Sequence, residues 1–322
     1  MTFPALKLVR HRVPDVRIHY VTTDYARELA ECCGLAHTVH LLRFERGIRN
    51  FWRYRELRRK VKAGLFDRVF IFGKPTRYVR HIGSIDRAYL SEDFAPGHKA
   101  ERLARAVMKG LDLDPCPVPS PQIAVPDDSQ ALEKFARLGL DVPRGGYLVV
   151  HPGSRSLGQR WTRPKKIWPT DRYAALIDVL ADRMPDLRVA LVGTARERPK
   201  VEARLERRIS NTRVLNFCGA TSLSEMLHLL KHAACVVGGD SGVMHLGTAV
   251  GTPMVTLFGP TDEHTTGPFG MGDKATFIRA VPYEAAIGDP DSMSSIGVEQ
   301  VVEEVARRLR PDDSKAAGPG RR

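Results

Sequence analysis

The stretch VVGGDSGVMHLGTAVGTPMVTLFGP, residues 236–260, decides how the rest of the chain is interpreted. Its two opening valines close an apolar run typical of a strand, and the glycines at 238–239 are expected to turn the backbone sharply. Asp240 has a side chain preferred at a helix N-cap, and Gly251 is typical of a helix end. Residues 254–258 are apolar enough for a second buried strand. The pattern predicts strand, turn, short helix, strand.

The start of the predicted helix is a natural site for a diphosphate. A helix start leaves about four backbone N–H groups without internal partners and carries roughly half a positive charge. Ser241 adds a hydroxyl, Gly242 lets an anion approach the backbone, and His245 follows Ser241 by one helical turn. The alternative is that Asp240 only caps a core helix and that His245 is structural. As a cap, Asp240 is expected to contribute about 1 kcal/mol.

A longer pattern carries a family resemblance. The spelling D-S-G-x-x-H-x-x-x-A-x-G-x-P, followed by LFGPTD, resembles the nucleotide-sugar signature of glycosyltransferase family 9, the lipopolysaccharide heptosyltransferases. Upstream lie two further family-like blocks, HPGS at 151–154 and KIWP at 166–169. The resemblance covers residues 145–275 well and the first 140 residues loosely. It implies an α/β fold of the GT-B type, with two Rossmann-like domains facing across a cleft.

The resemblance also assigns donor-binding residues. It implies that Lys166 neutralises the departing diphosphate and that Glu197 contacts the nucleoside. The alternatives are a surface lysine in a basic loop and a glutamate that favours a helix macrodipole. Gly153 and Ser154 follow a predicted strand at its carboxyl end, where ligands bind in open α/β sheets. The predicted donor site therefore comprises Gly153, Ser154, Lys166, Glu197, Asp240, Ser241, Gly242 and His245.

Length and periodicity predict two domains. The 322 residues are 43% hydrophobic and 27% charged, which suits a globular chain with two cores. Apolar runs alternate with amphipathic helices, as in a parallel α/β sheet. We expect the polar, glycine-rich residues 260–270 to be an exposed loop. The predicted parts are an acceptor-side domain at 1–140, a nucleotide-sugar-binding domain at 141–296, a C-terminal helix at 297–310 and a disordered tail at 311–322.

Residues 43–62 are the most basic stretch, with nine Lys or Arg and two Glu. They add to a formal net charge of +13 for the whole chain. One interpretation is a solvated helix face; the other is a patch for an anionic glycolipid acceptor or a membrane surface. No recognisable nucleic-acid module accompanies the charge, so nucleic acid is not a predicted partner.

The sequence predicts neither a metal nor a cofactor. Asp112 and Asp114 form a D-x-D before a proline-rich segment, and His228 and His232 lack a third ligand at a recognisable spacing. Five cysteines without C-x-x-C spacing argue against a disulfide framework and a zinc site. No G-x-G-x-x-G follows a strand, which disfavours a dinucleotide oxidoreductase. Without a recognisable signal peptide or membrane span, the predicted location is the cytoplasm, with possible peripheral attachment to the inner membrane.

The resemblance implies a reaction: inverting, metal-independent transfer of heptose from ADP-heptose to a lipopolysaccharide inner-core acceptor. A helix dipole with Lys166, Ser241 and His245 is consistent with a leaving nucleoside diphosphate stabilised without metal. ADP as the nucleotide comes only from the resemblance. The alternative is a non-catalytic homologue that binds nucleotide sugars or glycolipid, because the family's general-base aspartate has no counterpart in this sequence.

Met1 is not expected to be the start of the functional polypeptide. In the family, an apolar strand and a Gly-Asp turn precede the helix with which this sequence opens, and that aspartate is the proposed base. The first strand of a Rossmann unit is central, so its absence would leave buried backbone groups unpaired at about 1–3 kcal/mol each. We therefore expect about 20 further in-frame codons upstream that encode this strand and turn.

Overall fold

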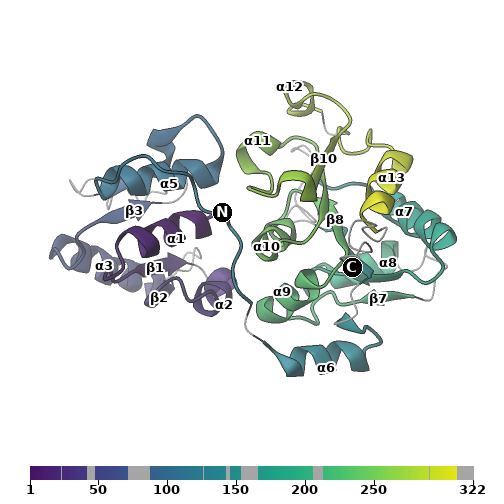
Figure 1. Cartoon of the computed structure of the whole chain (residues 1–322), viewed down its shortest axis with the longest axis horizontal. Helices are drawn as coiled ribbons and strands as arrows, with labels where there is room; N and C mark the ends of the chain where they lie inside the picture. The colour runs from purple at the N-terminus through teal and green to yellow at the C-terminus, as the bar shows by residue number, and fades with distance from the viewer. Residues whose placement is uncertain are drawn as a thin grey trace, which may run out of the picture. The chain divides into compact units, whose positions relative to one another are not determined.

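The structure, a computed structural model, describes residues 1–22, 24–41, 48–71, 88–125, 127–142, 146–153, 166–205, 213–289 and 291–309 (Figure 1). The chain divides into two compact units. The first comprises Met1–Pro126 and His264–Gly270, and the second comprises Asp127–Glu263 and Met271–Arg322. The division after Pro126 precedes the predicted boundary at 140, because helix α6 (Ser129–Arg137) belongs to the second unit. The predicted tail at 311–322 lies outside the described residues.

A six-stranded parallel sheet organises the second unit, in the order β10-β9-β8-β5-β6-β7. The chain progresses outward from β5 in one direction through β6 and β7, and then in the other through β8, β9 and β10. The reversal between β5 and β8 is a topological switch point, where open α/β sheets bind ligands. The strands are β5 (Tyr147–His151), β6 (Arg188–Leu191), β7 (Val214–Asn216), β8 (Cys235–Gly239), β9 (Met254–Phe258) and β10 (Ala275–Arg279).

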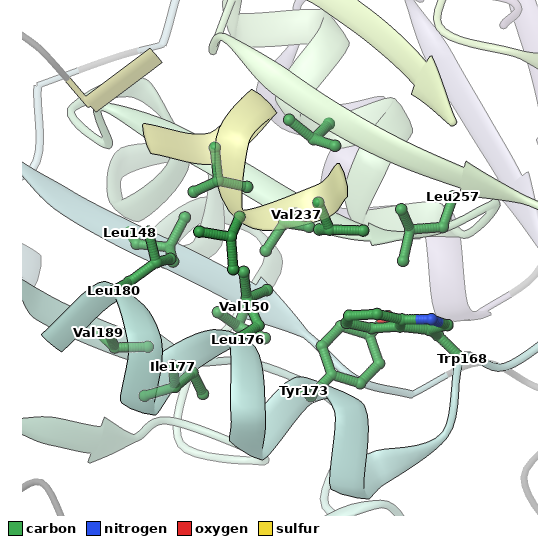
Figure 2. Packing of buried hydrophobic residues seen from close by; sticks show 14 of the residues in the cluster. Leu148, Val150, Trp168, Tyr173, Leu176, Ile177, Leu180, Val189, Val237 and Leu257 are labelled. Carbon is green, nitrogen blue, oxygen red and sulfur yellow. The ribbon is translucent and has the colours of Figure 1, made fainter. Parts of the chain in front are cut away.

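The three central strands β5, β8 and β9 are buried on both faces, as expected for a parallel sheet covered by helices. Leu148 and Val150 of β5 pack into a core that also contains Leu176 of helix α7 (Figure 2). Trp168, just before α7, is fully buried and meets Tyr173 edge-on, with the ring centroids 4.8 Å apart. The helices are α7 (Thr170–Arg183), α8 (Arg198–Arg204), α9 (Leu223–Lys231), α10 (Gly242–Val250), α11 (Glu263–Thr266), α12 (Tyr283–Ala286) and α13 (Val298–Leu309).

The two glycines at 238–239 are strand residues, which corrects the predicted glycine turn. Gly238 pairs with His151 of β5 and with Thr256 of β9, and Gly239 pairs with Leu257. A Cβ on Gly238 would lie 2.9 Å from the carbonyl oxygen of His151, so the glycine allows a close approach rather than a turn. The predicted helix end is confirmed, since Gly251 adopts a left-handed conformation with φ of 75°.

The first unit contains two separate two-stranded parallel sheets, β1-β2 and β3-β4. Its apolar core lies between helices α1 and α5, where Leu8 packs with Leu103 and Val107. Ordered along the chain, its elements are α1 (Phe3–Arg12), β1 (His19–Thr22), α2 (Asp24–Cys32), β2 (Thr38–Leu41), α3 (Ile48–Lys62), β3 (Val69–Ile71), β4 (Ala88–Leu90) and α5 (Lys99–Gly110). In the described part of the chain, no helix combines the length and apolar character needed to cross a membrane.

Residues 264–270 join the first unit through His98. The ring accepts a hydrogen bond from the Ala100 backbone at Nδ1, 3.1 Å away, and so caps α5. Its other nitrogen, Nε2, then carries the hydrogen and donates to the carbonyl of Gly267 at 2.9 Å. The ring also stacks on Phe269, with centroids 4.8 Å apart. Gly267 is buried, so the expectation that residues 260–270 form a fully exposed loop is wrong.

Acidification is expected to weaken this arrangement. Burial holds the pKa of His98 below its ordinary value, so below about pH 6.5 the unfolded chain takes up the proton first and stability falls towards the folded pKa. Asn at position 98 keeps a capping acceptor without a titrating ring. Urea unfolding of His98→Asn at about pH 7.5 and about pH 5.5 should therefore show a smaller pH dependence than the parent chain. The control is exposed His11→Asn; equal pH dependence in all three proteins would contradict the role of His98.

Candidate functional site

Helix α10 begins at the topological switch point without a side-chain cap. Its N-cap residue is Ser241, whose side chain makes no capping hydrogen bond. The prediction that Asp240 is the N-cap is wrong, because Ser241 occupies that position and the Asp240 carboxylate is held by Lys166. Asp240 Oδ2 accepts from Lys166 Nζ at 3.3 Å, and Oδ1 lies 3.9 Å from His245 Nε2. The first backbone N–H groups of α10 therefore have no side-chain acceptor from the cap residue.

Lys166 is placed by the buried segment that follows it. Trp168 is fully buried and donates from Nε1 to the carbonyl of Ile296 at 3.1 Å, which anchors the chain two residues after the lysine. A Cβ on Gly239 would lie 2.9 Å from the carbonyl oxygen of Lys166. Glycine at the end of β8 therefore lets this segment lie directly against the strand. The Lys166 side chain is 38% exposed and that of Asp240 is 12% exposed, so the pair lies at the surface of the site.

His151 orients Ser241 and is a residue that the sequence interpretation missed. It is the last residue of β5, is buried, and its Nδ1 lies 3.0 Å from Ser241 Oγ. This bond turns the Ser241 hydroxyl towards β5 and away from its own helix. Burial lowers the pKa of His151, and the carboxylate of Glu197 acts in the opposite direction. The signal was present, since His151 opens the HPGS block.

Glu197 lies in the turn that follows β6. Its Oε2 accepts hydrogen bonds from the backbone N–H and the hydroxyl of Thr194, at 2.7 and 2.8 Å. Although Glu197 stands at the N-cap position of α8, its side chain does not cap that helix. The carboxylate is buried, with 8% of the residue exposed. The geometry therefore fixes the glutamate in a tight turn at the carboxyl ends of the strands, while its predicted nucleoside contact stays a prediction.

The remaining predicted donor-site residues are Gly153, Ser154 and Gly242. Gly153 is buried directly after β5, and Gly242 is exposed in the first turn of α10. Ser154 lies outside the described residues, so its predicted contact stays a prediction. The structure thus brings Lys166, Asp240, Ser241 and His245 together around one helix start, with His151 behind them.

Arg279 holds the segment after β9 and was also missed. Its guanidinium donates to the carbonyls of Gly259 and Thr261 and to the carboxylate of Glu263, with Nε 3.3 Å from Oε1. Only 12% of its side chain is exposed, and the guanidinium carbon lies 5.9 Å from the ring centroid of Phe258. One side chain from β10 therefore fixes the LFGPTD segment. No local sequence pattern could reveal this, because the partners are up to 20 residues away.

The other acidic and histidine residues were possible metal ligands in the sequence. Among the described residues, no group of three or more His, Cys, Asp or Glu side chains is arranged to hold a metal ion. Asp112 has a positive φ of 51° directly after α5. His228 is buried within α9, and His232 is the C-cap residue of the same helix.

A family comparison decides where the chain belongs. Residues 92–293, more than half of the chain, match the model of glycosyltransferase family 9 (heptosyltransferase). The chain belongs to this family. It is 33% identical over 175 residues to lipooligosaccharide heptosyltransferase 2 of Haemophilus influenzae, a match that covers 53% of this chain and 48% of the relative. The chain thus matches about half the length of this family 9 relative.

Solved structures show the fold. The E. coli ADP-heptose lipopolysaccharide heptosyltransferase II superposes with a TM-score of 0.73 at 21% identity, over 98% of this chain and 95% of that chain. An E. coli heptosyltransferase solved with ADP superposes with a TM-score of 0.67 at 21% identity, over 95% of each chain. The predicted GT-B class, α/β with two Rossmann-like domains, is confirmed.

Asp240 is expected to stabilise the folded chain through its ion pair with Lys166, not through an N-cap hydrogen bond. Because the pair is partly exposed, we expect Lys166→Met and Asp240→Asn to cost about 0.5–1 kcal/mol each, with a coupling of similar size in the double variant. Urea unfolding of the four proteins measures this cycle, and added salt should shrink the coupling. Strictly additive effects would show that the two side chains do not interact.

Proposed function

We propose that this chain is a glycosyltransferase that transfers heptose from ADP-heptose to a lipopolysaccharide inner-core acceptor, with inversion and without a metal ion. One observation supports the proposal above the others: a helix start free of a side-chain cap, with Lys166 and Ser241 beside it at the topological switch point. A helix start with unbonded N–H groups suits a diphosphate, and the chain belongs to glycosyltransferase family 9.

The chemistry follows from charge. As the bond between sugar and diphosphate breaks, negative charge accumulates on the phosphate oxygens. The backbone N–H groups at the start of α10 and the Lys166 ammonium would stabilise that negative charge, because both are held in fixed positions. A diphosphate would compete with Asp240 for Lys166, since both are anions. Positioned cations and amides would thereby do what a divalent metal does in other transferases.

ADP is proposed as the nucleotide from the relatives. One structural neighbour is an ADP-heptose lipopolysaccharide heptosyltransferase, and another was solved with ADP. His151 ends β5, the neighbour of β8, and Thr194 and Glu197 follow β6, the next strand beyond β5. A nucleoside attached to the diphosphate would extend to this side, across the carboxyl ends of β5 and β6. We place the nucleoside against this side, and the predicted contact with Glu197 forms part of that proposal.

The acceptor proposed here is an anionic glycolipid of the lipopolysaccharide inner core. The relative from Haemophilus influenzae is named for a lipooligosaccharide acceptor, which supports a glycolipid. The net charge of +13 favours phosphorylated partners. A cytoplasmic site of action stays a prediction.

Nucleotide-sugar profiling tests the proposal. At a free concentration of about 100 times its dissociation constant, a ligand stabilises by about 2.7 kcal/mol, which raises the melting temperature of a domain of this size by roughly 5–10 °C. We expect ADP-sugars to produce this shift and UDP- or GDP-sugars to produce less. Lys166→Met should weaken ADP binding about tenfold or more, because a charged hydrogen bond is lost.

The matched control is Lys274→Met, an exposed lysine on the second unit. Protection by UDP- or GDP-sugars alone would contradict the ADP-heptose assignment. Protection by ADP-heptose without measurable transfer to a lipopolysaccharide acceptor would instead support the non-catalytic homologue.

A further inference from the structure

A row of paired residues across the six-stranded sheet places His151 on the face that α10 covers. His151 of β5 pairs with Gly238 of β8, which in turn pairs with Thr256 of β9. A Cβ on Gly238 would lie 3.2 Å from Cβ of His151 and 3.4 Å from Sδ of Met244, a residue of α10. The imidazole and the helix therefore share one face of the sheet, and glycine at position 238 keeps a further side chain out of the space beside them.

Ser241, the residue directly before α10, bonds to this ring instead of to its own helix. An N-cap serine ordinarily accepts a hydrogen bond from the second or third backbone N–H of its helix. The Ser241 side chain makes no such bond, and its Oγ lies 3.0 Å from Nδ1 of His151. His151 therefore orients the hydroxyl, while the N–H groups at the helix start receive no acceptor from the cap residue.

The direction of the bond between Ser241 and His151 decides whether the hydroxyl can bind an anion. A hydroxyl has one hydrogen to donate and two lone pairs that accept. If Ser241 donates to Nδ1, only its lone pairs remain for a phosphate oxygen, and they repel it. If Nδ1 carries a hydrogen and donates to Oγ, the hydroxyl hydrogen is free for the phosphate. Only the second direction adds Ser241 to the groups that bind a diphosphate.

The His151 ring can supply the hydrogen at Nδ1. Burial lowers the pKa of His151, while the carboxylate of Glu197 acts in the opposite direction. A neutral imidazole has one hydrogen that either nitrogen can carry, and a protonated ring carries one on each. A diphosphate at the start of α10 favours a hydrogen at Nδ1 in both cases, since that form offers it a hydroxyl donor.

We propose that His151 is a positioning residue, which donates from Nδ1 to Ser241 Oγ and so directs the hydroxyl hydrogen of Ser241 to the diphosphate of the donor. The inference rests on the proposed function, because it requires a diphosphate at the start of α10. It adds a buried residue that acts through Ser241, behind the groups that meet the ligand.

A double-mutant cycle on ADP affinity tests the proposal with the full chain. Ser241→Ala removes a hydrogen bond to a charged group and should weaken ADP binding about tenfold or more. His151→Leu should also weaken it about tenfold, because a Ser241 hydroxyl without this partner turns back to cap α10 and competes with the diphosphate. The double variant should bind ADP within about twofold of the weaker single variant. Isothermal titration calorimetry measures the four dissociation constants.

His151→Asn separates positioning from packing. The asparagine amide keeps an N–H donor for Ser241, so ADP affinity should stay within about threefold of that of the parent chain. The matched control is His228→Leu, which also removes a buried histidine from the second unit and should change ADP affinity by less than about twofold. Urea unfolding verifies that each variant is folded.

NMR of the 15N-histidine-labelled parent chain observes the hydrogen directly. The His151 resonances are assigned by their loss in His151→Asn, and the 15N chemical shift separates a ring nitrogen that carries a hydrogen from one that does not. In the ADP complex, we expect Nδ1 of His151 to carry a hydrogen. This measurement stands even if His151→Leu fails to fold.

Three results would overturn the proposal while ADP still binds the parent chain: additive losses in the cycle, equal losses in His151→Asn and His151→Leu, or an Nδ1 without hydrogen in the ADP complex. Absence of ADP binding to the parent chain would overturn the proposed donor site, and the role of His151 with it. The two kinds of failure are therefore distinguished by the parent chain alone.

Discussion

The interaction between Lys166 and Asp240 determines the character of the proposed donor site. A carboxylate directly before a helix would ordinarily turn back and satisfy the first backbone N–H groups. In this chain the ammonium of Lys166 holds that carboxylate at 3.3 Å, and His245 Nε2 lies 3.9 Å from its other oxygen. The N-cap residue Ser241 bonds to His151 instead of to its own helix, so the start of α10 has no side-chain cap from either residue. An anion that binds there gains the helix amides and an adjacent cation together.

The buried core fixes this interaction in place. Trp168 anchors the segment that carries Lys166, and the absence of a side chain on Gly239 lets that segment lie against β8. On the other side of the site, a hydrogen bond between Ser241 and His151 connects the N-cap residue of α10 to the end of β5. The candidate site therefore lies at the carboxyl ends of β5 and β8, which are neighbours in the sheet.

The sequence alone predicted the helix and strand ends that depend on residues close together in the chain. The predicted helix end at Gly251 and the predicted strand at residues 254–258 are confirmed. The N-cap prediction failed at Asp240, because Ser241 occupies the N-cap position and the Asp240 carboxylate bonds to Lys166, 74 residues earlier in the chain. Arg279 was missed for the same reason: its acceptors lie on a different segment, and only the folded sheet brings them together. The candidate site was thus predicted by its residues, while its hydrogen bonds were not.

The proposed transfer reaction requires that a nucleoside diphosphate binds at the uncapped start of α10. Selective 15N-glycine labelling tests it most directly, because Gly242 lies in the first turn of α10 and Gly251 directly follows its last residue. Assignment follows from the loss of one resonance in Gly242→Ala and one in Gly251→Ala. On titration with ADP, the account predicts a saturable shift of the Gly242 amide resonance, with little change at Gly251. A Gly242 resonance that does not move while ADP binds elsewhere would contradict it.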